Sequence, residues 1–149
     1  MLVAYRHGLR AQELCDLEWS QIDWKAATLH VLRVKSGKPA AHPIRGDELR
    51  ALRELHRNQE PASPFVFTTE RGGPFTTDAV NRLVKRLGES NKLFGFPIHM
   101  HMLRHSCGFY LAKHGHDLRL IQDYLGHRDP KHTAHYTRTA AGRFEELWR

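Results

Sequence analysis

Apolar residues in the first third of the chain follow two different spacings. They recur at helical intervals from Leu2 to about Leu17, which predicts one helix over that range, and a loop is expected at 20–23. Apolar and polar residues alternate over 28–34, which predicts a strand. The Gly- and Pro-containing segment 35–39 predicts a turn, and 40–44 a returning strand. The pattern therefore indicates an antiparallel hairpin with basic residues at its tip.

The rest of the chain carries mostly helical periodicity. Leu49, Leu52 and Leu55 share one side of a helix that Asp47 caps and that ends near His56. A brief strand is expected at 65–67, a helix that begins at Thr77, and a loop at 90–97. Two further helices are expected from His101 to Lys113 and from Leu118 to Leu125. Another helix should begin at Asp129 and Pro130, and the last should run from about Ala140 to Trp148. The predicted fold is mainly α with a small antiparallel β-sheet (α+β).

Composition narrows the class of protein. A chain of 149 residues with 40% hydrophobic content can bury one ordinary core, which argues against a disordered protein. A formal net charge of +7 favours a polyanionic partner, with nucleic acid ahead of a membrane surface. No apolar run could span a bilayer and no signal-peptide pattern is present, so a cytoplasmic protein is expected. Cys15 and Cys107 lie among helix-patterned apolar residues, which favours buried, reduced thiols over a disulfide.

Six side chains along the sequence are suited to phosphoryl chemistry, and in chain order they are Arg10, Lys35, His101, Arg104, His127 and Tyr136. Guanidinium forks can clamp the nonbridging oxygens of a phosphodiester. A lysine or histidine can protonate the leaving sugar oxygen, and a tyrosine hydroxyl can act as a covalent nucleophile. The set therefore favours attack of a tyrosine on a phosphodiester, with no metal ion or other cofactor required.

Three segments resemble the tyrosine recombinase (phage integrase) family in identity, order and spacing. They are Gly8 to Leu14, His101 to His105, and Leu125-Gly126-His127 followed by Tyr136. The resemblance covers nearly the whole chain and implies the tyrosine recombinase catalytic-domain fold. It also implies site-specific cleavage and rejoining of double-stranded DNA through a covalent 3′-phosphotyrosine. The protein would be a monomer when free and a homotetramer on synapsed DNA.

Other segments are similar to the fimbrial phase-variation invertases, short bacterial recombinases that flip a promoter segment. These segments are Tyr5 to Gly8, Leu120 to Arg128, and Arg143 to Trp148. This likeness implies DNA inversion. Family members usually carry an upstream core-binding domain, and this sequence is expected to lack both that domain and the start of the catalytic domain. Residues 1–149 are therefore expected to form a single catalytic domain that binds DNA weakly alone.

The family pattern implies that Arg10 and Arg104 bind the scissile phosphate and that Tyr136 attacks it. Glu13 lies one helical turn after Arg10 and would fix that guanidinium. Each residue also has a plainer interpretation, because an arginine on a helix is usually solvated and a tyrosine often only packs. The matching order and local context of all six residues favour the catalytic interpretation.

The histidines and the lysine are implied to act on protons and phosphate oxygens. His101 would assist proton transfer and hold the phosphate, while His127 would hydrogen-bond the same oxygens or orient the nucleophile. Lys35 would protonate the leaving 5′ oxygen, and it is favoured over Lys38 on the same turn because it ends the first strand. His101 and His105, four residues apart, could instead be capping or core histidines.

Two other interpretations of the whole chain stay open. Histidine pairs such as His99 and His101, or His114 and His116, could bind a metal ion. No HExxH motif or paired CxxC completes such a site, so no metal is expected. The chain could also be a catalytically inactive DNA-binding or regulatory relative of the recombinases. The presence of all six side chains argues against this alternative.

The helix expected from Thr77 has a basic outer face made by Arg82, Lys85 and Arg86. Such a face can simply be solvated. Beside the residues above, we expect it to contact the DNA backbone or major groove.

Overall fold

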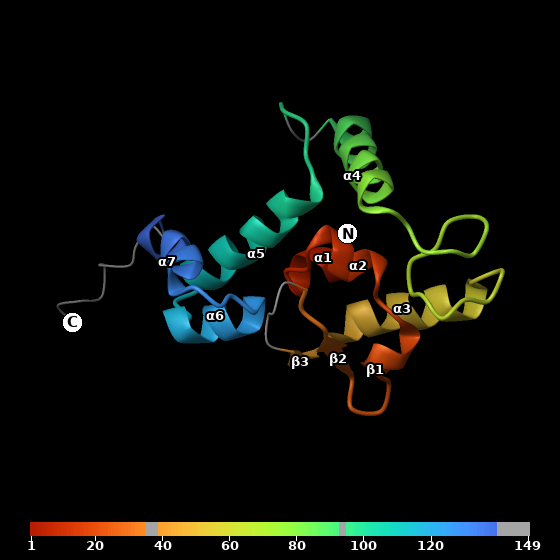
Figure 1. Cartoon of the computed structure of the whole chain (residues 1–149), viewed down its shortest axis with the longest axis horizontal. Helices are drawn as coiled ribbons and strands as arrows, with labels where there is room; N and C mark the ends of the chain where they lie inside the picture. Colours follow the sequence, from red (N-terminus) through yellow and green to blue (C-terminus); the bar gives the residue numbers. More distant parts are fainter. Residues whose placement is uncertain (35–38, 93–94, 140–149) are drawn as a thin grey trace.

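The computed structural model describes residues 1–34, 39–92 and 95–139, and most of its chain is helical (Figure 1). The N-terminal half contains, in order, helices α1 (Leu2–Arg6) and α2 (Ala11–Cys15), a 3₁₀ turn η1 (Trp19–Gln21), strands β1 (Ile22–Asp23), β2 (Thr28–Val31) and β3 (Ala40–Pro43), and helix α3 (Gly46–Asn58). The C-terminal half contains helices α4 (Thr77–Asn91), α5 (Met100–Lys113), α6 (Leu118–Leu125) and α7 (Pro130–Thr139). The predicted class, mainly α with one small antiparallel sheet, is confirmed.

Helix α5 connects the N-terminal helices to α6 and α7. It starts near α1 and α2 and runs toward α6 and α7, while the sheet and α3 lie on the other side of α1 and α2 (Figure 1). The main core draws on the N-terminal helices, the sheet, α3 and α4. A second buried cluster lies between α5, α6 and α7, and it contains Cys107, Ala112, Ile121, Leu125 and Tyr136.

The predicted helix over 2–17 is wrong, because the chain breaks it into α1 and α2. Gly8 has a φ of +57°, a left-handed conformation that glycine adopts at no steric cost. A Cβ at this position would clash with Leu125 Cδ2, so the glycine also allows α6 to approach the break. Arg10 is extended and precedes α2. The buried Leu9 keeps the apolar stripe continuous, which hides the break in the hydrophobic pattern.

The predicted hairpin forms, with strands shorter than expected. Strand β2 pairs antiparallel with β3, so that Leu29 lies opposite His42, and β1 pairs with the other edge of β2. The loop expected at 20–23 is wrong in its second half, because the buried Ile22 forms β1 opposite Leu29. The hairpin tip at 35–38 lies outside the described residues.

Capping residues predict some helix ends and not others. The Asp117 side chain accepts a 2.9 Å hydrogen bond from the first turn of α6, and Gly126, with a φ of +68°, ends that helix, as expected. Asp47 is wrong as a cap, because α3 begins after Arg45 and Asp47 lies in its first turn. There its carboxylate accepts 2.7 and 2.8 Å hydrogen bonds from the Arg6 guanidinium, a distant partner that no local pattern reveals.

Three smaller expectations have different outcomes. The segment 65–67 makes only an isolated bridge with Glu18 instead of a strand. Cys15 and Cys107 are both free and buried, as expected. The helix expected over 140–148 lies outside the described residues. Within the described part of the chain, no helix combines the length and the apolar character needed to cross a membrane.

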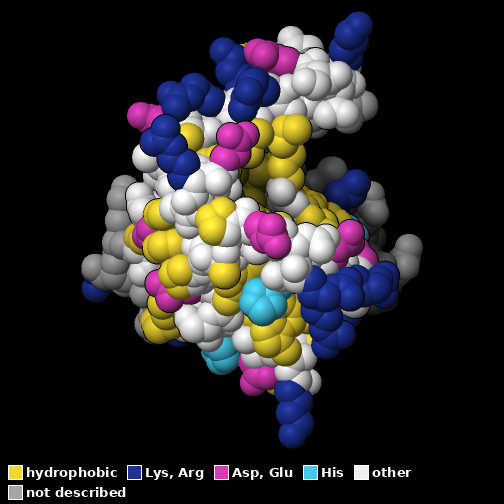
Figure 2. Space-filling model, turned by 90° about the vertical axis from the view of Figure 1, so that its right-hand side faces the viewer, with side chains coloured by type: hydrophobic (Ala, Val, Ile, Leu, Met, Phe, Trp, Pro, Cys, Tyr) yellow, Lys and Arg dark blue, Asp and Glu magenta, His cyan; other side chains and the backbone are white. Residues whose placement is uncertain are grey.

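The outer face of α4 is basic, as the sequence predicted. Arg82, Lys85 and Arg86 are exposed, and with Arg71 they line a hollow of about 890 Å³ between α4 and the segment 68–75. Lys and Arg side chains gather at the end of the molecule where α4 lies, at the top of Figure 2.

Candidate active site

One cavity of about 480 Å³ lies between the start of α2, helix α5 and the segment from the end of α6 into α7. Five of the six predicted residues line it, and they are Arg10, His101, Arg104, His127 and Tyr136. The sixth, Lys35, lies outside the described residues. The five residues come from distant parts of the sequence and meet at this one cavity. Arg82, Lys85 and Arg86 line the separate hollow beside α4 instead.

Arg104 is fixed by backbone carbonyls from both halves of the chain. It is 1% exposed, its Nη1 donates to the Gly8 carbonyl, and its Nη2 donates to the Leu125 carbonyl at 2.8 Å. Burial, with the nearby charges of Arg10 and Arg33, lowers the pKa of Arg104 to about 10. The guanidinium therefore stays protonated at neutral pH. It is held between the end of α6 and the turn at residues 7–10 that joins α1 to α2, called the N-terminal turn below.

Glu13 makes the contact with Arg10 that the resemblance implied. Its buried carboxylate accepts hydrogen bonds from the Arg10 backbone N–H at 2.9 Å and from Arg10 Nη1 at 3.0 Å. Burial alone raises the pKa of this carboxyl, but the charge of Arg33 and the hydrogen bonds outweigh burial and lower it. Glu13 is thus an ionised carboxylate that orients the Arg10 guanidinium beside the cavity.

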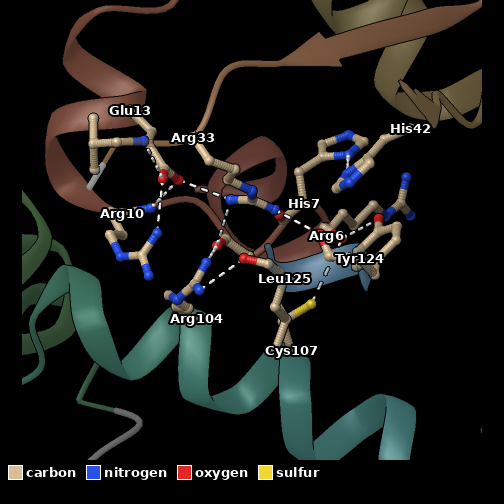
Figure 3. Close-up of polar contacts among 12 residues, drawn as sticks. Arg6, His7, Arg10, Glu13, Arg33, His42, Arg104, Cys107, Tyr124 and Leu125 are labelled. Atoms are coloured by element: carbon tan, nitrogen blue, oxygen red, sulfur yellow. Dashed lines mark hydrogen bonds and ion pairs between the residues drawn. The ribbon is translucent and has the colours of Figure 1, made fainter. Parts of the chain in front are cut away.

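Arg33 is a member of this cluster that the sequence interpretation missed (Figure 3). Its side chain is fully buried, and its Nη1 lies 2.8 Å from Glu13 Oε2. Burial lowers the pKa of Arg33, and the charge of Glu13 opposes that effect. The sequence does contain a signal. The alternation of β2, continued past its end, places residue 33 on the face of the buried Leu29 and Val31, where a charge must find a partner.

Tyr136 is buried beside α5, and its hydroxyl is held by a histidine. The residue is 2% exposed, and its oxygen lies 2.8 Å from His105 Nδ1. Gly108 permits the close packing, because a Cβ there would lie 2.6 Å from Tyr136 Cε2. Burial raises the pKa of Tyr136, so the phenol is protonated at neutral pH and shares a hydrogen bond with His105 Nδ1. His105 is a second residue whose role the sequence left open.

Three of the imidazoles that line the cavity, those of His101, His105 and His127, are neutral at physiological pH. Burial and the charge of Arg104 lower the pKa of His105, and burial with the neighbouring His105 lowers that of His101. Burial and Arg104 lower the pKa of His127 to about 3. His127 Nδ1 lies 2.8 Å from the hydroxyl of Thr133, which fixes the ring orientation. Each of these neutral rings therefore has one nitrogen that can accept a hydrogen bond and one N–H that can donate.

No group of three or more His, Cys, Asp or Glu side chains that could hold a metal ion occurs among residues 1–34, 39–92 and 95–139. The cations that the described cavity offers to an anionic ligand are side chains, with Arg10 and Arg104 at its centre. This arrangement suits binding of a phosphodiester next to a protonated tyrosine.

Comparison with known proteins places the chain in a family. It matches the protein-family model described as "Phage integrase family" over residues 1–143. It is 42% identical over 151 residues to the type 1 fimbriae regulatory protein FimB of Escherichia coli strain K12, a match that covers 99% of this chain and 75% of FimB. The resemblance to fimbrial recombinases is therefore confirmed.

Solved structures agree with the sequence matches. The fold is similar to that of XerA recombinase, with a TM-score of 0.81, 26% identity, and coverage of 98% of this chain and 54% of the XerA chain. It is also similar to the fold of the XerH site-specific recombinase bound to its difH substrate, with a TM-score of 0.78, 24% identity, and coverage of 98% of this chain and 44% of XerH. This chain thus spans about half the length of the solved recombinases. By its motifs, its fold and the match over residues 1–143, the chain belongs to the phage integrase family.

Proposed function

We propose that this chain is the catalytic domain of a site-specific DNA recombinase that cleaves and rejoins double-stranded DNA through a covalent 3′-phosphotyrosine. One observation carries the proposal: two arginines and a buried tyrosine, whose hydroxyl is bonded to an imidazole, line the same cavity. Family membership supports recombination as the activity. The similar XerH recombinase was solved bound to its difH substrate, which supports DNA as the partner.

In the cleavage step, Arg10 and Arg104 bind the nonbridging oxygens of the scissile phosphate. The two guanidiniums stabilise the negative charge that concentrates on these oxygens in the transition state. The Tyr136 oxygen attacks phosphorus, and its proton passes to His105 Nδ1, which lies 2.8 Å away. Burial and Arg104 lower the pKa of His105 and keep its ring neutral, so that in one tautomer Nδ1 has a free lone pair for this proton.

The bond from phosphorus to the sugar 5′ oxygen breaks as the bond to Tyr136 forms. We assign the proton for the leaving 5′ oxygen to Lys35, as the family resemblance implies. His101 holds a phosphate oxygen, and His127, with Nδ1 bonded to Thr133, offers its other ring nitrogen to the same phosphate. Rejoining reverses these steps when the 5′ hydroxyl of a second strand attacks the phosphotyrosine.

The proposed partner is double-stranded DNA, held at the cavity and along α4. The exposed Arg82, Lys85 and Arg86 would contact backbone phosphates away from the cleavage position. We further propose that four protomers assemble on two synapsed sites and that free protein is monomeric. The similarity to a fimbriae regulatory protein supports sites that flank a promoter segment, which recombination would invert. Replacing all three α4 residues with Gln should lower the salt slope of DNA binding by about 2 to 3.

A suicide DNA duplex tests the proposed chemistry. Duplexes with a nick near the crossover are tiled across the genomic DNA beside the gene and incubated with the protein in a chelating buffer. Wild type should form an adduct that resists denaturant, and Tyr136→Phe should bind DNA without forming one. Tyr110→Phe is the matched control, because Tyr110 is a half-exposed tyrosine on α5, and it should keep the adduct.

Three other outcomes would change the assignment. An adduct that persists in Tyr136→Phe would contradict the proposed nucleophile. Specific DNA binding with no adduct from wild type would support the inactive, regulatory alternative. Cleavage that stops when divalent metal is chelated would indicate a metal-dependent hydrolase.

A further inference from the structure

We infer that Arg33 is the positioning residue that sets the geometry of both phosphate-binding arginines. This inference rests on the proposed function. Arg33 does not line the cavity and is not one of the six residues implied by the family pattern. It lies directly behind the cavity-lining residues, and its contacts reach Arg10 and Arg104 through one shared partner each (Figure 3).

The fork of Arg33 joins three separated segments of the chain. Nη1 donates to Glu13 Oε2 at 2.8 Å and to the Gly8 carbonyl at 3.2 Å. Nη2 donates to the His7 carbonyl at 3.0 Å and to the Tyr124 carbonyl at 2.7 Å. The N-terminal turn, α2 and α6 are therefore tied together by one side chain that is fully buried.

One branch of this network controls Arg10. Glu13 accepts hydrogen bonds from both Arg33 and Arg10, so the position of its carboxylate depends on both guanidiniums. The backbone N–H of Val34 also lies 3.3 Å from Glu13 Oε1. The strand end that leads to Lys35 is therefore anchored to the same carboxylate as Arg10.

A second branch controls Arg104. The Gly8 carbonyl accepts from Arg33 Nη1 and also from Arg104 Nη1, so both guanidiniums share one backbone oxygen. Arg33 binds the Tyr124 carbonyl, and Arg104 binds the next one, at Leu125. Arg33 and Arg104 thus both donate hydrogen bonds to the N-terminal turn and to the end of α6.

The stem of Arg33 also contacts the turn that carries His127. A Cβ on Gly126 would lie 2.7 Å from Arg33 Cγ, so the glycine lets the arginine pack against the turn. Any larger residue at 126 would displace the stem or the turn. Arg33 therefore contacts the turn before α2, helix α2 itself and the end of α6, and it reaches α5 only through the Gly8 carbonyl that it shares with Arg104.

The shape of the guanidinium, and not its charge alone, explains why the residue at 33 must be an arginine. Arg10, Arg33 and Arg104 surround the single carboxylate of Glu13, and the charges of Arg10 and Arg33 contribute to the lowered pKa of Arg104. A phosphodiester would offset this excess positive charge. Lysine would keep the charge, but one ammonium group cannot span four acceptors held by a planar fork.

The test compares Arg33→Lys with wild type in single-turnover adduct formation at saturating protein, on two nicked duplexes. One has an ordinary scissile phosphate, and the other has a neutral methylphosphonate at that position, which needs less help from the guanidiniums. We expect Arg33→Lys to be slower by about 100-fold on the phosphate and by less than about 10-fold on the methylphosphonate. Arg119→Lys, an exposed arginine on α6, is the matched control and should match wild type on both.

A role limited to stability gives a different result. In that case Arg33→Lys lowers the folded fraction, and the rate per folded molecule falls equally on both substrates or not at all. Either outcome overturns the inference. If Arg33→Lys does not fold, Arg33→Met with Glu13→Gln removes the buried pair together, and a wild-type rate from that folded double variant also overturns it.

A separate readout does not need catalysis. NMR of the arginine Nε–H groups of Arg10 and Arg104 reports whether each guanidinium is held in place. We expect slow hydrogen exchange in wild type and exchange at least about 10-fold faster for both groups in Arg33→Lys. If wild type forms no adduct, the proposed function fails while this measurement still tests the positioning role. Unchanged exchange in the variant contradicts the inference.

Discussion

Two polar clusters lie on either side of the N-terminal turn, and they differ in composition and in exposure. The arginine cluster, made of Arg10, Glu13, Arg33 and Arg104, is ionised and borders the cavity. The histidine cluster, made of His7, His42 and Glu48, is enclosed, and each of its members is 1% exposed. The same turn thus separates an arginine cluster beside the cavity that holds Tyr136 from a histidine cluster that joins helices to the sheet.

The histidine cluster is built for packing. His7 Nε2 lies 2.8 Å from Glu48 Oε1, and His7 Nδ1 lies 3.1 Å from His42 Nδ1. The His42 ring stacks on Tyr124, with 3.8 Å between ring centroids. These contacts join α1, β3, α3 and α6. The backbone carbonyl of His7 connects this cluster to Arg33, so the histidines support the arginines from behind.

Burial alone therefore does not identify a catalytic group. Both clusters contain buried polar atoms without a hydrogen-bond partner among the described residues, and these are Arg33 Nε, His42 Nε2 and Glu48 Oε2. The arginine cluster differs in that Arg10 and Arg104 line the same cavity as Tyr136. We therefore expect changes in it to lower the rate of cleavage, and changes in the histidine cluster to lower stability.

The largest effect is expected for Arg104→Lys. Lysine keeps the charge but loses the planar guanidinium fork, which donates to two backbone carbonyls. Single-turnover adduct formation should fall by about 1,000-fold. Thermal unfolding measured on the same sample shows how much folded protein remains. A rate within a few fold of wild type would remove Arg104 from the proposed site.

Glu13→Gln should have the next largest effect. The substitution leaves Arg33 buried without its counterion and frees the Arg10 guanidinium. We expect about a 100-fold slower adduct rate and a free energy of unfolding lower by about 3 kcal/mol. Glu89→Gln, on the exposed end of α4, is the control. An unchanged rate per folded molecule would show that Arg10 does not need this carboxylate.

Glu48→Ala breaks the histidine cluster and leaves the arginine cluster in place. His7 loses its 2.8 Å partner in a buried position, so the free energy of unfolding should fall by about 2 kcal/mol. The adduct rate per folded molecule should stay at the wild-type value. Glu54→Ala, an exposed glutamate on the same helix, should change neither quantity. A large loss of rate would mean that the histidine cluster belongs to the active site.

The smallest effect concerns pH. Burial, His7 and Arg33 lower the pKa of His42 to about 3, below its ordinary value near 6.5. Its contribution to stability is therefore complete at neutral pH, and it is lost only as the pH falls from about 6.5 toward 3, by at most about 1.4 kcal/mol per pH unit. His42→Asn keeps a hydrogen-bonding group near the Nδ1 position and does not titrate. Its urea-unfolding stability should fall less steeply with acid, and an unchanged slope would contradict a role for His42 in this pH dependence.

Local sequence signals predict the elements that depend on local contacts. Helix α6 begins and ends as expected, because Asp117 and Gly126 act on their own neighbours. The basic face of α4 follows directly from helical spacing. Five of the predicted site residues line one cavity, because the family motifs carry their order along the chain.

Features that depend on distant contacts were not predicted. Gly8 breaks the first helix where α6 and α5 pack against it, and the apolar stripe gives no sign of this break. Asp47 faces Arg6 instead of capping α3. The hydrogen bond from Tyr136 to His105 spans 31 residues, and no spacing rule connects the two positions.

The proposed function depends above all on a covalent bond between the Tyr136 oxygen and DNA. The most direct test is tandem mass spectrometry of the protein–DNA adduct after nuclease and protease digestion, from a reaction run in a chelating buffer. We expect a nucleotide attached through its 3′ phosphate to Tyr136. A nucleotide attached to any other residue, or an adduct that forms only when divalent metal is added, would contradict the proposal.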